Sequence, residues 1–96
     1  MAVPKESIHK NPEQPEQILY ISPEENITEI RERLGRTRAH DVALVFPPQT
    51  RLRSHVAWRL LKQRAQELGK DISIVSSDQH IRAIARSVQF KTASSL

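Results

Sequence analysis

The chain has 96 residues, the length of one domain, and it contains no cysteine. The lack of cysteine excludes disulfides, thiolate nucleophiles and sulfur-ligated zinc. The net charge of +4 is compatible with an acidic partner, nucleic acid or an anionic membrane surface. Acidic and basic side chains are interleaved along the sequence, however, and this pattern is typical of an ordinary solvated surface.

The sequence divides into a polar start and one apolar-patterned domain. Residues 1–16 carry three prolines among polar residues, which predicts a flexible N-terminal tail, and residues 17–96 form the single predicted domain. The first residues lack the apolar core of a signal peptide. No apolar run approaches the roughly 18 residues that span a bilayer. We therefore expect a soluble chain with no membrane span.

Three apolar segments of strand length, at residues 17–22, 42–46 and 72–75, alternate with helical patterns. The first two have no polar face, which is expected of strands covered on both sides. Apolar strands joined by amphipathic helices are typical of parallel βαβ units. We expect an α/β domain of βαβαβα order with a mostly parallel sheet in two or three layers, flavodoxin-like or half-Rossmann-like. Residues 89–93 are a candidate for a short fourth strand.

Capping signals predict where the first helix begins and ends. Ser22 and Asn26 both fit the first position of a capping box. Asn26 is favoured because an apolar stripe starts directly after it, formed by Ile27, Ile30 and Leu34. Gly35 is the natural end of this helix.

The second helix, predicted over residues 51–68 between a Thr50 cap and Gly69, carries two apolar stripes. One has the width expected of a sheet-facing surface and consists of Ala57, Trp58, Leu61, Ala65 and Leu68. The other lies on a different side and consists of Leu52, Val56 and Leu60. This second stripe packs either against the neighbouring helix or against another chain, for example in a homodimer.

Ligands of open parallel sheets bind where the strands end and the helices begin. Here a phosphate-sized anion site is a candidate at Thr50, Arg51, Arg53 and Ser77. Against it, both glycines follow helices, and no phosphate-binding glycine loop precedes one. Capping alone explains Thr50, and Ser77 or Asp78 is the predicted cap of the third helix.

Other chemistry finds little support. The four histidines are far apart and show no metal-ligand spacing, and there is no G-x-S-x-G nucleophile motif. We therefore expect no catalytic residues, no metal and no cofactor. A basic patch is conceivable at Arg31, Arg33, Arg36 and Arg38, but Glu29 and Glu32 dilute it. All four aromatic residues are predicted to lie in the core, which argues against nucleic acid as a partner.

Several segments together resemble a small α/β domain of uncharacterised bacterial membrane-associated proteins and of some baseplate J-like proteins. The segments span most of 17–96 and include residues 18–21, 26–30, 42–47, 54–56, 60–62 and 68–75. Phe46 and Trp58 depart from it, since smaller aliphatic residues are expected there. The resemblance implies a cytoplasmic module of a larger protein, and it brings no catalytic residues with it.

The leading hypothesis is a non-catalytic protein-interaction or scaffolding module that binds a protein partner. The alternative hypothesis is a binding domain for a phosphorylated small molecule or nucleotide at the carboxyl ends of the strands.

Overall fold

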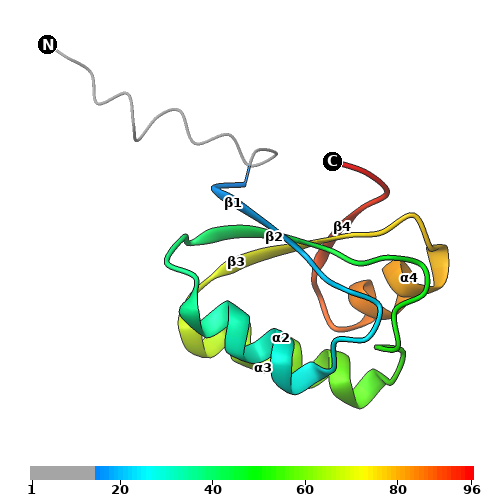
Figure 1. Cartoon of the computed structure of the whole chain (residues 1–96), viewed down its shortest axis with the longest axis horizontal. Helices are drawn as coiled ribbons and strands as arrows, with labels where there is room; N and C mark the ends of the chain where they lie inside the picture. Colours follow the sequence, from blue (N-terminus) through cyan, green and yellow to red (C-terminus); the bar gives the residue numbers. More distant parts are fainter. Residues whose placement is uncertain (1–14) are drawn as a thin grey trace, which may run out of the picture.

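The computed structural model describes residues 15–96, which form three helices and one four-stranded sheet (Figure 1). In chain order the elements are β1 (Gln17–Tyr20), α2 (Ile27–Arg36), β2 (Asp41–Val45), α3 (His55–Leu68), β3 (Asp71–Val75), α4 (Gln79–Ser87) and β4 (Lys91–Ala93). The predicted α/β class and order are confirmed, and the short fourth strand is present. Most of the predicted tail lies outside the described residues. Glu16, assigned to that tail, donates its backbone N–H to the carbonyl of Asp41.

All neighbouring strands are parallel, and the sheet order is β1-β2-β3-β4. Right-handed crossovers that always step in the same direction place every helix on the same face. Figure 1 accordingly shows α2, α3 and α4 below the sheet and no helix above it. The fold is therefore two-layered. Its strand order never reverses, so the sheet lacks the crevice in which doubly wound sheets bind their ligands.

The register assigns each strand residue to one face. Leu19, Leu44 and Ile74 are aligned and point towards the helices, where Leu44 and Ile74 are fully buried. The intervening residues of each strand point to the opposite face. This opposite surface, called the open face below, consists of Ile18, Tyr20, Ala43, Val45, Ser73, Val75, Lys91 and Ala93.

Polar side chains cap the N-termini of the helices by accepting hydrogen bonds from backbone N–H groups of the first turn. Asn26 accepts from the Glu29 N–H, and the Glu29 carboxylate accepts from the Asn26 N–H, which completes the capping box predicted there. Asp78 caps α4 by accepting from the His80 N–H at 2.8 Å. Gly69 ends α3 with a left-handed φ of 66°, a conformation that glycine adopts without steric cost.

Two predicted helix ends are wrong. α3 begins at His55 with Ser54 as its cap, whereas Thr50 is buried in the preceding loop and accepts from the Leu52 N–H. Gly35 lies inside α2 and does not end it. A Cβ at Gly35 would stand 2.8 Å from the Arg64 Nη2, so the glycine allows the Arg64 side chain of α3 to lie against α2.

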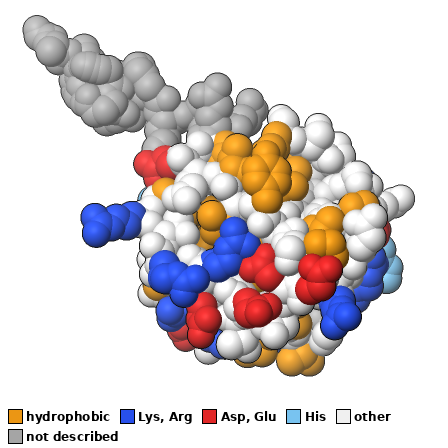
Figure 2. Space-filling model, viewed as in Figure 1, with side chains coloured by type: hydrophobic (Ala, Val, Ile, Leu, Met, Phe, Trp, Pro, Cys, Tyr) orange, Lys and Arg blue, Asp and Glu red, His pale blue; other side chains and the backbone are white. Residues whose placement is uncertain are grey.

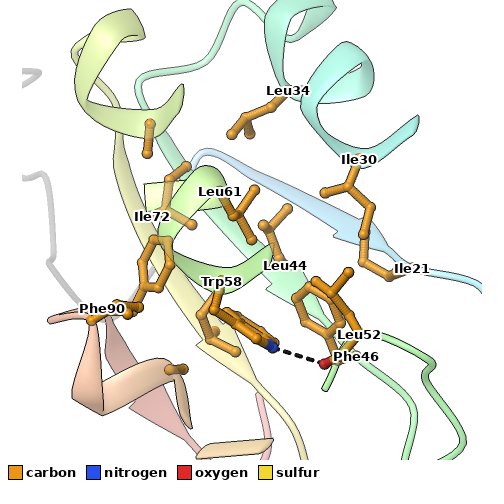
Figure 3. Close-up of a cluster of buried hydrophobic side chains, with 14 of the residues drawn as sticks. Ile21, Ile30, Leu34, Leu44, Phe46, Leu52, Trp58, Leu61, Ile72 and Phe90 are labelled. Atoms are coloured by element: carbon orange, nitrogen blue, oxygen red, sulfur yellow. Dashed lines mark hydrogen bonds between the residues drawn. The ribbon is translucent and has the colours of Figure 1, made fainter. Parts of the chain in front are cut away.

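Three aromatic rings form the centre of the core between sheet and helices (Figure 3). Trp58 is fully buried. Its ring centroid lies 4.9 Å from that of Phe46 and 6.1 Å from that of Phe90. Its Nε1 donates a 2.7 Å hydrogen bond to the Leu52 carbonyl, which satisfies the buried polar group of the indole. The large residues at Phe46 and Trp58 thus complement each other in volume.

No helix in the described part of the chain is both long and apolar enough to cross a membrane.

Candidate functional site

No helix covers the open face, although Ala43 and Val75 at its centre are buried. It contains a hollow of about 650 Å³ lined by Pro15, Ile18, Ala43, Ser73, Val75, Lys91, Thr92, Ala93, Ser95 and Leu96. Beyond the hollow the same surface continues to Tyr20, which is 64% exposed. Ile18 is 39% and Leu96 64% exposed. Parallel sheets normally bury both faces, so the exposed Ile18 and Tyr20 side chains make this face a candidate interaction surface.

The prediction that the first strand is covered on both sides is wrong, as is the placing of Tyr20 in the core. β1 is an edge strand, and only its helix-facing side is packed. The other three aromatic residues lie in the core as expected. The sequence signal was ambiguous because an apolar run describes a buried strand equally well whether a helix or another molecule covers its second face.

A basic groove lies beside the edge of β1, on the helix side of the sheet. It has a volume of about 490 Å³ and is lined by Gln17, Leu19, Arg33, Arg36, Thr37 and Arg38. Figure 2, with β1 and α2 in front, shows hydrophobic side chains adjoining a belt of Lys or Arg and Asp or Glu side chains. Arg33 pairs with Glu25 at 2.7 Å. Arg36 and Arg38 form no ion pair with any residue of the described range 15–96.

The predicted cluster of four arginines is divided by the structure. Arg31 lies with Arg64, Thr28 and Glu32 around a separate depression between α2 and α3. Arg33, Arg36 and Arg38 share the groove beside β1. The sequence spacing identified the basic residues but could not show that they border an exposed strand.

The predicted anion site is brought together only in part. Arg53 donates to the Thr50 and Pro48 carbonyls and pairs with the Asp78 carboxylate at 3.1 Å. The Thr50 hydroxyl is buried and accepts from the backbone. Arg51 and Ser77 are exposed. The guanidinium that would hold an anion therefore already holds two loops together.

The Arg53 guanidinium also sets the electrostatics of this end of the sheet. Its hydrogen bond to the carboxylate, followed by the bond from the His80 N–H, lowers the pKa of Asp78 below its ordinary value of 3.8. A carboxylate kept ionised in this way repels an approaching anion. The arrangement stabilises loops and does not favour phosphate binding.

The three residues of the predicted interface do not share one exposed stripe. Leu52 precedes α3 and is 5% exposed, Leu60 is half-buried, and Val56 is 55% exposed. Leu52 packs within the core cluster, and its carbonyl accepts from Trp58. Of the three, only Val56 is exposed enough to contact another chain without a rearrangement.

Among the described residues 15–96, no group of three or more His, Asp or Glu side chains is arranged to hold a metal ion. Comparison with protein-family models, curated proteins and solved structures finds no match to this chain.

Proposed function

We propose that this domain is a non-catalytic protein-interaction module whose partner covers the open face of the sheet. The observation that carries the proposal is that all three helices pack on one face of a parallel sheet, while Ile18 and Tyr20 are exposed on the other. Burying apolar area stabilises a complex by about 25 cal/mol per Å². A partner that covers this face would therefore bind through burial alone, without any catalytic chemistry. The resemblance noted above favours a larger bacterial membrane-associated protein as its setting.

A protein fits this surface better than a small apolar ligand does. A ligand of drug size would occupy the hollow of about 650 Å³. Tyr20 lies outside the lining of that hollow, yet it is the most exposed aromatic side chain of the described residues. Exposed tyrosines that flank an apolar centre are typical of protein interfaces. The partner surface therefore extends from the hollow to the edge of the sheet.

The test uses the natural lack of cysteine, because one introduced cysteine provides one labelling position. Ser73→Cys places a photo-crosslinker in the hollow of the open face, and Gln66→Cys places the same label on exposed α3 as the matched control. In lysate of the source cell, we expect a discrete protein adduct from position 73 alone.

Competition establishes that the adduct is specific. Excess unlabelled wild-type protein should abolish it, whereas excess Ser73→Arg protein, whose open face is blocked, should not. Equal adducts from positions 73 and 66, or none from position 73, would refute the proposal. A small molecule released from the hollow, with no protein adduct, would instead identify a ligand-binding domain.

A further inference from the structure

We propose that the free edge of β1 binds an extended segment of the partner that alternates apolar and acidic residues and adds to the sheet as a fifth strand. The inference rests on the proposed function, because it specifies which part of a protein partner would bind and with what chemistry. Its test is separate from the crosslinking experiment, since it probes the edge of the sheet and not the hollow.

The backbone of β1 leaves hydrogen-bonding groups at the edge. The Ile21 N–H donates to the Val45 carbonyl, so alternate residues of the strand direct their backbone groups inward to β2. Ile18 and Tyr20 direct theirs outward. Arg33 donates to the Tyr20 carbonyl at 3.1 Å, which occupies one of these groups at the end of the strand. Within residues 15–96, no strand pairs with this edge. Such an edge is a template for strand addition.

The two sides of this edge differ in chemistry. On the open face, the strand presents the exposed Ile18 and Tyr20 side chains. On the helix face, it presents Gln17 and Leu19, and the basic groove adjoins them with Arg36 and Arg38. A fifth strand alternates its side chains between the same two faces. Its apolar residues would therefore extend the open face, while its acidic residues would meet the two arginines.

A second copy of this chain fits the edge poorly. Two β1 strands placed side by side would bring Gln17 and Leu19 of the second copy towards the basic groove, and neither of them carries a charge. They would also bring together the Arg36 and Arg38 side chains of both grooves, and like charges at close range destabilise a complex. Charge complementarity instead favours a partner segment with carboxylates on one side.

The probe is an eight-residue peptide that alternates valine with glutamate, and the control peptide replaces each glutamate with lysine. Binding to the full chain is measured by fluorescence anisotropy. Amide hydrogen exchange of the wild-type protein is then compared with and without peptide. We expect only the glutamate peptide to bind, and we expect the Ile18 and Tyr20 amides to gain protection as they form strand hydrogen bonds.

Charge reversal tests the groove. Arg36→Glu combined with Arg38→Glu should weaken binding of the glutamate peptide by about tenfold or more. Arg51→Glu combined with Arg59→Glu alters two exposed arginines outside the groove and makes the same change of charge. This control should change the dissociation constant by less than about threefold.

Two outcomes would overturn the inference: equal weakening by both double variants, or no gain of protection at Ile18 and Tyr20 in the wild-type protein. The exchange measurement needs no variant, so a charge-reversed protein that folds poorly does not obscure the result. If position 73 crosslinks a protein while the peptide fails to bind, the interaction module stands and only the strand addition is wrong.

Discussion

The Nη2 of Arg53 lies 3.1 Å from the Oδ2 of Asp78, the N-cap residue of α4. This ion pair joins the loop before α3 to the start of α4. The same guanidinium donates to the Thr50 and Pro48 carbonyls. Asp78 in turn accepts from the His80 N–H. One ion pair therefore connects the loops that follow two neighbouring strands, β2 and β3.

This ion pair predicts an acid-dependent loss of stability. The pKa of Asp78 is lowered, chiefly by the Arg53 hydrogen bond. The ionised carboxylate therefore stabilises the fold at any pH above its ordinary pKa of 3.8. The contribution is lost as the pH falls below 3.8 and through the lower folded pKa. We expect Arg53→Gln to raise the pKa of Asp78 towards the ordinary value, as measured by carbon NMR of the carboxyl group. Asp78→Asn, which can still cap α4, should flatten the loss of stability in urea titrations at acid pH. An Asp78 pKa that does not change in Arg53→Gln would contradict this account.

The two glycines predict opposite responses to the same substitution. Gly35→Ala adds a Cβ inside α2 at a place occupied by the end of the flexible Arg64 side chain, whose ion pair with Glu67 is long, at 3.4 Å. The arginine can move at little cost, so the gain in helix propensity should raise the free energy of unfolding by about 0.5 kcal/mol. Gly69→Ala has open space but a φ of 66°, and it should lower the free energy of unfolding by about 1 kcal/mol. Urea unfolding followed by circular dichroism measures both, and equal signs would refute the explanation.

The contrast between Leu52 and Val56 predicts how the suggested helix interface behaves. Leu52 lies in the core, so Leu52→Ala should lower the free energy of unfolding by about 2–3 kcal/mol. Val56 is exposed, and Val56→Ala should change it by less than about 0.5 kcal/mol. Both values should be the same at low and high protein concentration, because a core residue acts within one chain. A destabilisation by Leu52→Ala that depends on protein concentration would contradict this account if sedimentation also shows a wild-type dimer that dissociates on dilution. Leu52 would then belong to a dimer interface.

Much of the fold followed from short-range patterns. The apolar runs around Leu19, Leu44 and Ile74 became parallel strands, and the Asn26 capping box formed as the spacing predicted. Gly69 ended α3 because its left-handed backbone is decided by residues close in the chain. Thr50 and Gly35 were misassigned for the opposite reason, since the Thr50 hydroxyl bonds within its own loop and Gly35 makes room for a side chain of another helix.

The sequence by itself determined which segments become strands and helices, because periodicity, caps and turn residues act over a few neighbouring positions. Tertiary structure alone decided that the strands follow one another in order, that all three helices therefore share one face, and that Tyr20 and Ile18 remain exposed on the other. An apolar side chain carries the same hydrophobic driving force whether its cover comes from the same chain or from a partner. The arrangement of the strands in space therefore separates the core of this domain from its candidate interface.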